Sequence, residues 1–457
     1  MTGSGDSRVR DSIARESKLA ENRDAFMPVV VVDIELTKPL PVVGLGSGCR
    51  RTWILARLWR EPIGTLLIET DQAPLTREML GRRLWEEFSS VINARFAETG
   101  LPSRSGIPAS GFEDALEQAP LLLTRAQATN EVPFISVVVC TRDRPHLLER
   151  CISSLRLQEY PHFEVIVVDN APTGDLVHKL IAEVNDGDQY RYVLEPMPGL
   201  SRARNTGVAA AKGEIVAFLD DDDEADSFWL VGIARGFARD GRIGCVTGSV
   251  LPARLDTVAQ ELYEQLGGHQ SGRGFAPKRF SRSGPQNPLF PLPPFGVGAN
   301  MAFSRSALTS IEGFDVALGA GTPTAACEDT LAMTLALLEG YEIAYEPSAV
   351  MWHHHRREIE DLERQLHGYS IGLAAFYTAL LRHRPRTLFG LLKLIPSFAG
   401  YIRSARGASA APSALSQVKR RHFAGLIVGS AAYIGSTVAQ HWLMLGSRRR
   451  ARKELKL

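Results

Sequence analysis

The sequence predicts an α/β protein built on a doubly wound, mostly parallel sheet. Between residues 133 and 219, short apolar runs alternate with helical patterns, and polar side chains follow the end of several runs. Four consecutive aspartates, Asp220 to Asp223, follow the last run. Alternating strands and helices form parallel βαβ units. Ligands of such sheets bind outside the carboxyl ends of the strands, so we expect a ligand site at that edge.

The elements of this main domain are predicted in order from apolar periodicity. Strands are expected at 135–140, 164–168, 190–194 and 215–219, and helices at 146–157, 175–184 and 201–211. Lys212-Gly213 then ends the third helix as a glycine cap. Residues 251–294 are rich in Gly, Ser and Pro and predict a long binding loop or lid near the acceptor entrance.

Four further regions surround this domain, which we place at residues 133–358. We expect a mobile tail, a small α+β accessory module, a connector and a helical carboxyl-terminal region, at 1–26, 27–100, 101–132 and 359–457. Within the module, strands are predicted at 29–36, 51–59 and 65–69, a turn at 61–64 and a helix at 78–96. The glycine-rich run at 44–48 lacks the strand-then-helix context of a phosphate loop.

Composition excludes several classes of protein. The 457 residues carry a formal net charge of +1, which gives no sign of a nucleic-acid partner. Five scattered cysteines without a CxxC pair favour a reducing compartment over a zinc site or a disulfide framework. The polar amino terminus has no apolar signal core, so we expect a cytoplasmic protein.

The four aspartates predict a metal site. Carboxylates at this density repel one another unless a cation lies among them, and their oxygens suit Mg²⁺ or Mn²⁺. The alternative is a solvated acidic turn. A metal held by Asp220 and Asp222 would neutralise a diphosphate, and Asp169 would accept hydrogen bonds from a base or ribose. Arg202 and Arg204, on the preceding helix, would face the phosphates or the base, or else solvent.

Four motifs together resemble the nucleotide-binding half of family 2 glycosyltransferases, which have the GT-A fold. They are Val-Val-Cys-Thr-Arg-Asp-Arg-Pro at 138–145, Val-Val-Asp-Asn at 167–170, Gly-Leu-Ser-Arg-Ala-Arg-Asn at 199–205 and Phe-Leu-Asp-Asp-Asp-Asp at 218–223. The resemblance implies that Thr141, Asp143 and Asp169 contact the nucleoside. It makes Asp222 the principal metal ligand and puts Asp220 near both ribose and metal. Arg204 and Asp221 are also expected to bind the substrate.

The resemblance extends to about residue 357. A Gly-Ala-Asn segment containing Asn300 would lie near the donor sugar and the acceptor. In the Glu328-Asp329 pair, Asp329 would be the catalytic base and Glu328 a substrate contact. The alternative for this pair is a helix start favoured by the dipole. The family often has glycine before the pair, where this chain has Cys327.

A run of three histidines at 353–355 follows a strand-like segment at 348–351. In the family, a histidine after this strand can complete the metal or diphosphate site, and His353 matches that position best. His355 would lie on the same face if the strand continues. The alternative is an exposed polar run.

These residues predict a metal-dependent, inverting glycosyltransferase that moves a sugar from a nucleotide-diphosphate donor to a hydroxyl of a glycan or lipid-linked acceptor, in cell-envelope synthesis. Two alternatives remain: a nucleotidyltransferase, which would need a glycine in the loop at 141–145, and a catalytically silent sugar-nucleotide binding module.

The carboxyl-terminal region adds a prediction about location. Residues 423–445 are mostly apolar and are flanked by Lys-Arg-Arg at 419–421 and Arg-Arg-Arg at 448–450. Three interpretations stay open: a helix lying on an anionic inner membrane surface, a membrane-spanning anchor, and a helix packed on the catalytic domain.

Overall fold

A computed structural model describes residues 28–44, 51–69, 74–115, 133–184, 187, 189–270, 272–285, 287–289, 295–394 and 428–443. The predicted tail, most of the glycine-rich run, residues 116–132 of the connector and both basic clusters lie outside these residues.

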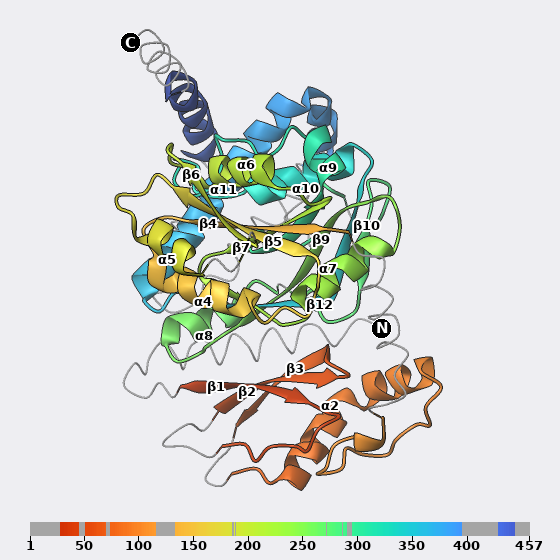
Figure 1. The fold of residues 1–457 in the computed structure, drawn as a ribbon. Helices are drawn as coiled ribbons and strands as arrows, with labels where there is room; N and C mark the ends of the chain where they lie inside the picture. Colours follow the sequence, from red (N-terminus) through yellow and green to blue (C-terminus); the bar gives the residue numbers. More distant parts are fainter. Residues whose placement is uncertain are drawn as a thin grey trace.

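The amino-terminal module is a three-stranded sheet covered by one long helix (Figure 1). Strand β1 (Val29–Glu35) pairs parallel to β2 (Arg51–Leu58), which pairs antiparallel to β3 (Glu61–Glu69). Helix α2 (Arg77–Glu98) buries Leu84 and Phe88 against the sheet, and the 3₁₀ helix η2 (Glu113–Ala115) closes the module. Because Ile107 and Phe112 also join this core, the module continues into the predicted connector.

The turn between β2 and β3 differs from the prediction. It falls at Trp59-Arg60, where both residues have left-handed φ angles of 54° and 66°, and not at 61–64. Non-glycine residues seldom adopt these angles. Here the Glu35 carboxylate accepts hydrogen bonds from the backbone N–H groups of both residues, at 3.1 and 2.6 Å, and stabilises the turn.

The main domain is a nine-stranded sheet with helices on both faces (Figure 1). Eight strands lie in the order β10-β12-β9-β11-β7-β4-β5-β6, and β8 pairs with β12. The strands are β4 (Ile135–Thr141), β5 (Phe163–Asn170), β6 (Tyr190–Glu195), β7 (Ile215–Asp220), β8 (Asp223–Ala225), β9 (Ile243–Pro252), β10 (Lys278–Phe280), β11 (Asn300–Ser304) and β12 (Glu342–His353). Strands β7, β4, β5 and β6 run parallel, as predicted, whereas β11 is antiparallel to both of its neighbours.

Two apolar layers hold the helices on the sheet. On one face lie α4 (Pro145–Leu155), α5 (Leu176–Val184) and α7 (Trp229–Ala238), and on the other lie α6 (Leu200–Ala210), α9 (Arg305–Ser310), α10 (Glu328–Leu338) and α11 (Ile359–His383). The β4 side chains alternate between the layers, since Val138 joins one core and Val137 and Val139 join the other. The doubly wound α/β architecture predicted from sequence is thus confirmed.

Residues 251–294 are more regular than predicted. They contain α8 (Val258–Gln265) and β10. Helix α8 begins with a capping box, in which the Thr257 hydroxyl accepts from the Gln260 N–H and the Gln260 side chain accepts from the Thr257 N–H.

Buried ion pairs attach the accessory module to the main domain. Arg57 donates to Asp226 at 2.7 Å, directly after β8, and Arg235 of α7 donates to Glu61 at 2.8 Å. Arg57 and Glu61 are both almost fully buried. The module is therefore fixed to the segment that follows the four aspartates.

The short 3₁₀ helix η3 (Pro385–Thr387) follows α11, and residues 388–394 and 428–443 are helical. Within 428–443 one face is buried, at Gly429, Tyr433, Ser436 and Gln440. Tyr433 donates to Asp315 at 2.6 Å and accepts from Arg382 of α11 at 3.1 Å. None of the helices that the structure describes is long and apolar enough to cross a membrane. The described part of this segment is thus packed on the main domain, as one of the three interpretations expected.

Candidate functional site

The sheet register aligns the polar residues that follow the predicted strands. Thr141, which ends β4, lies opposite Asp169 of β5, and its neighbour Cys140 lies opposite Asp220 of β7. On the other side of β7, Asn300 lies opposite Leu219. The carboxyl ends of the parallel strands therefore bring these side chains to one edge, as the sequence predicted.

The nucleoside-contact candidates lie on the β4 and β5 side of this edge. Asp143 has a left-handed φ of 54°, and its carboxylate accepts from the Thr173 N–H at 2.9 Å. Asp169 is fully buried and accepts from the Tyr192 hydroxyl at 3.1 Å, and its Oδ1 has no partner among the described residues. Burial raises the pKa of Asp169. An unpaired buried carboxylate oxygen fits a group that receives a hydrogen bond from a ligand.

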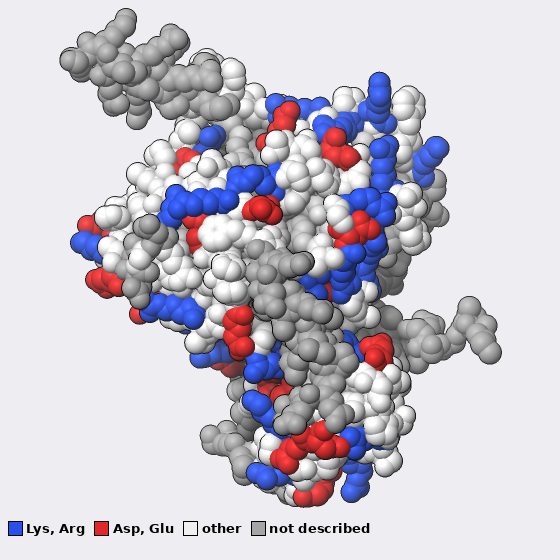
Figure 2. All heavy atoms as spheres, turned by 45° about the vertical axis from the view of Figure 1, so that its right-hand side comes forward, with Lys and Arg blue, Asp and Glu red and all other residues white. Residues whose placement is uncertain are grey.

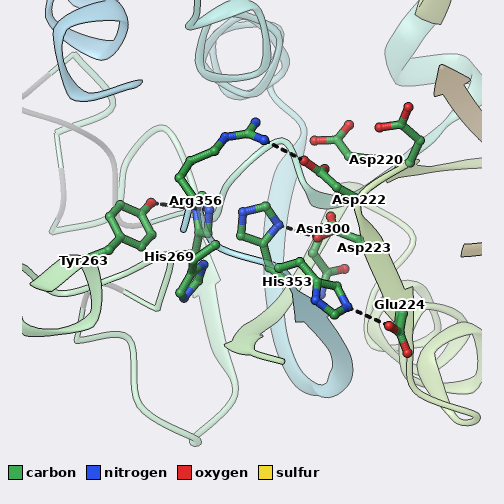
Figure 3. Close-up of polar contacts among 12 residues, drawn as sticks. Asp220, Asp222, Asp223, Glu224, Tyr263, His269, Asn300, His353 and Arg356 are labelled. Atoms are coloured by element: carbon green, nitrogen blue, oxygen red, sulfur yellow. Dashed lines mark hydrogen bonds and ion pairs between the residues drawn. The ribbon is translucent and has the colours of Figure 1, made fainter. Parts of the chain in front are cut away.

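The four aspartates differ in their partners, and Figure 3 shows Asp220, Asp222 and Asp223. Asp220 accepts from Arg204 at 3.2 Å, and Asp221 accepts from the Thr141 hydroxyl at 2.7 Å. Asp222 pairs with Arg356 at 3.4 Å and more loosely with Arg144, and Asp223 accepts from His353 Nδ1 at 2.5 Å.

Electrostatics separate Asp222 from its neighbours. Burial raises the pKa of Asp221 to about 7 and also raises the pKa values of Asp220 and Asp223, with repulsion from the other aspartates adding to the effect at Asp223. Burial acts against the charge of Asp222 too, but His353 and Arg356 hold its pKa below the usual range. Buried carboxylates that resist ionisation gain most from a nearby cation.

The side chains fit a divalent cation. Asp222, Asp223 and His353 are buried, and one ligand atom from each lies within 4.8 Å of the others. The Asp223 Oδ2 atom is buried without a partner among the described residues. Oxygen-rich donor sets of this kind suit Mg²⁺ or Mn²⁺. Sequence reasoning chose Asp220, Asp222 and His353 and missed Asp223. The feature that brings Asp223 to the site is the antiparallel pairing of β8 with β12, which puts Asp223 opposite His353.

The three histidines alternate along the end of β12. His353 and His355 lie on one side, within the same histidine group, and His354 pairs with Glu224 at 2.6 Å. His355 is buried and pairs with Glu264 of α8 at 2.8 Å. Burial lowers the pKa values of His353 and His355.

Arg204 lies beneath the site and connects two acids. Its guanidinium, which is 2% exposed, donates to Glu328 at 2.6 Å and to Asp220 at 3.2 Å. Burial raises the pKa of Glu328 to about 7, although Arg204 opposes that shift. Arg202 instead donates to Gln440 of the carboxyl-terminal helix. The structure thus gives Arg204 two protein carboxylates as partners.

Asp329 begins the helix α10 beside the Gly-Ala-Asn segment. Its carboxylate accepts from the Gly298 N–H at 2.6 Å and from the Thr330 N–H at 2.7 Å, and the residue is partly exposed. A Cβ atom on Gly298 would lie 2.8 Å from Asp329 Oδ2, so only glycine permits this approach. Cys327, which replaces the glycine often found in the family, has a left-handed φ of 70° at the helix N-cap.

Asn300 is buried among protein groups. Its Oδ1 accepts from Trp229 Nε1 at 2.9 Å, and its Nδ2 donates to the carbonyls of Ser249 and Ala349 at 2.9 and 2.8 Å. These bonds join β11, α7, β9 and β12. The side chain therefore supports the floor of the site in this structure.

Comparison with known proteins agrees with the motifs. Residues 136–311 match the family model Glycosyl transferase family 2. A Campylobacter jejuni protein named GalNAc(5)-diNAcBac-PP-undecaprenol beta-1,3-glucosyltransferase is 37% identical over 95 residues, or 20% of this chain and 31% of the relative. The glycosyltransferase AglE of Haloferax volcanii is 31% identical over 106 residues, or 22% of this chain and 34% of the relative. The chain thus spans about a third of the length of these curated relatives.

Solved structures also align with the chain. A mannosyltransferase from Pyrobaculum calidifontis, in complex with GDP-Man and Mn²⁺, aligns with 21% identity and a TM-score of 0.39, covering 73% of this chain and 89% of that chain. TarS 1-349 of S. aureus in complex with UDP-GlcNAc aligns with 16% identity and a TM-score of 0.38, covering 67% and 92%.

The family match covers strands β4 to β7 and all four aspartates, and the sheet has the doubly wound form expected of the GT-A class. The matched segment, residues 136–311, is thus similar to family 2 glycosyltransferases.

Proposed function

We propose that the chain is a metal-dependent, inverting glycosyltransferase that uses a nucleotide-diphosphate sugar. The observation that carries this proposal is the meeting of three kinds of group at one sheet edge: a buried, partly unpaired Asp169, the carboxylate and histidine group around Asp222, and a partly exposed Asp329.

The residues have separate roles in this mechanism. Asp143, Asp169 and Thr141 would bind the nucleoside, and Asp222, Asp223 and His353, with Asp220 beside them, would hold Mg²⁺ or Mn²⁺, which stabilises the departing diphosphate. Asp329, oriented by the Gly298 N–H, would take the proton of the acceptor hydroxyl while that oxygen attacks the anomeric carbon. Attack on the face opposite the leaving group would invert the centre.

A donor assay tests this proposal without a known acceptor. The purified chain is incubated with nucleotide-diphosphate sugars and Mn²⁺ or Mg²⁺, and the products are identified. Release of free sugar and nucleoside diphosphate supports the glycosyltransferase, whereas pyrophosphate exchange would support a nucleotidyltransferase. Binding without turnover, even with acceptor extracts, would point to a silent binding module.

We further propose that the acceptor is lipid-linked and that the chain lies on an anionic membrane surface. One matched relative is named for an undecaprenol diphosphate substrate. The helix at 428–443 presents exposed apolar side chains opposite its packed face, among them Ile434 and Trp442, which are 60% and 65% exposed. Phe389, in the helix at 388–394, is 73% exposed. Such faces bind the boundary between headgroups and acyl chains.

Vesicle binding tests this location. The full chain should sediment with anionic vesicles at low salt and be released at high salt. Replacing Ile434 and Trp442 by Gln should weaken sedimentation, and replacing Leu67, an exposed apolar residue of the accessory module, should not. Equal sedimentation of both variants would contradict a membrane role for the helix.

A further inference from the structure

Three buried histidines form a second group beside the aspartates. His353 and His355 come from the end of β12, and His269 comes from the segment after α8. Each offers a ring nitrogen, and the three atoms lie within 4.8 Å of one another. Figure 3 shows the His353 ring between His269 and the aspartates. This group lies largely outside the substrate site proposed above, since His269 and His355 have no role there.

The outer partners of the histidines are those of metal ligands. His353 donates one ring nitrogen to Asp223 at 2.5 Å, and His355 pairs through Nε2 with Glu264 at 2.8 Å. The Tyr263 hydroxyl lies 3.2 Å from His269 Nδ1 and 3.3 Å from its Nε2, so it can pair with either nitrogen. In protein metal sites, a ligating histidine almost always gives its other nitrogen to a carboxylate or another polar group, which orients the ring.

One nitrogen in the group has no partner. His355 Nδ1 is buried and forms no hydrogen bond with any described residue, and the residue is 4% exposed. A buried polar atom left unpaired costs about 1–3 kcal/mol. Edge-to-face packing accounts for some of the arrangement, because the His269 and His353 ring centroids are 4.6 Å apart. Packing does not supply the missing partner of Nδ1.

We propose that His269, His353 and His355 bind a transition-metal ion such as Zn²⁺, at a site chemically distinct from the aspartate site. Three imidazole nitrogens select ions of this class, whereas carboxylate oxygens select Mg²⁺ or Mn²⁺. The ion ties the segment after α8 to the end of β12. Because His353 belongs to both groups, an ion bound by the histidines competes with the aspartates for that ring.

Cobalt provides a direct test, since its visible spectrum reports nitrogen ligation. The full chain is stripped of metal, saturated with Mg²⁺ to fill oxygen sites, and titrated with Co²⁺. We expect one tightly bound equivalent with intense visible bands, displaced by Zn²⁺. His269→Ala should lose the bands, and Asp222→Ala, which leaves all three histidines in place, should keep them. Glu264→Gln should weaken Co²⁺ binding about 10–100-fold by removing the outer partner of His355.

Several results would overturn the proposal. If the wild-type chain shows no visible bands with Co²⁺, the three histidines bind no metal and only pack against one another. Bands that persist in His269→Ala, or that vanish in Asp222→Ala, would place the ion elsewhere. If circular dichroism shows that His269→Ala does not fold, the test rests on Glu264→Gln. Unchanged Co²⁺ affinity in Glu264→Gln would then refute the site. None of these readouts depends on glycosyltransferase activity.

Discussion

Replacing Arg204 by Met should destabilise the protein. Neutralising Glu328 in the same chain should restore part of the lost stability. Arg204 is 2% exposed and is the cation that pairs with Glu328 at 2.6 Å and Asp220 at 3.2 Å. Methionine preserves most of the side-chain length but leaves both carboxylates without this partner. Breaking a buried ion pair on one side costs about 3–5 kcal/mol, a large part of the 5–15 kcal/mol that typically separates folded from unfolded protein.

The double variant isolates the pair. In Arg204→Met/Glu328→Gln the buried negative charge at 328 is gone, so the free energy of unfolding should exceed that of Arg204→Met. Urea unfolding followed by circular dichroism gives the four values of the cycle, and the coupling should amount to about 0.5–3 kcal/mol. Glu149→Gln, on an exposed face of α4, is the matched control and should change stability little.

The effect should depend on pH. Burial raises the folded pKa of Glu328 from 4.5 to about 7, so its contribution to stability is present below pH 4.5 and is lost as the pH rises through about 7. Because Arg204 opposes that rise, its removal should enlarge the loss. The deficit of Arg204→Met should therefore be greater at about pH 8 than at about pH 5. A deficit below about 1 kcal/mol, or one independent of pH, would refute this account of the network.

Four other predictions concern the site and the module. Asp329→Asn should lower turnover about 10²–10⁴-fold with little change in donor affinity, and a matching loss of donor binding in calorimetry would instead make Asp329 structural. Asp222→Ala should abolish transfer and the Mn²⁺-induced rise in melting temperature, and retention of that rise would remove Asp222 from the ligand set. In the wild-type chain, Mn²⁺ affinity should increase as the pH rises through about 7, because loss of the Asp221 proton adds a negative charge next to Asp222, and a flat pH profile would count against a role for that carboxylate. Arg57→Met should cost about 1–3 kcal/mol of stability by removing the hydrogen-bonding partner of the partly buried Asp226 and the exposed Asp33, whereas an unaltered urea midpoint would mean that these pairs contribute nothing.

The main sheet was predictable because each of its parallel strands has a recognisable local sequence pattern. The apolar runs that become β4, β5, β6 and β7 are short, rich in β-branched residues and followed by polar groups, so element type, order and ligand edge could all be derived from sequence. Helix α8 was missed although its Thr-x-x-Gln capping box was visible, because the Gly, Ser and Pro around it dominated the interpretation.

The errors arose where distant residues decide the local structure. Pro62 and Gly64 gave an ordinary turn signal, but Glu35 stabilises a turn at Trp59-Arg60 instead. Asp223 was not chosen as a ligand because its partner, His353, is 130 residues away and meets it only through β8 and β12. No local pattern indicates such a pairing.

The ion pairs between the accessory module and the main domain have a consequence for how this chain can change. Arg57 and Glu61 lie on the strands β2 and β3, are buried, and pair with Asp226 and Arg235 of the main domain. Figure 2 shows the smaller lobe at the bottom of the view below the larger main domain. Deleting the module would remove Arg57 from Asp226, three residues beyond Asp223, and would leave Arg235 with Glu346 as its carboxylate partner in place of both Glu61 and Glu346. The module therefore cannot be added or removed on its own. A protein that gains or loses the module must also change the surface of the main domain just after the four aspartates.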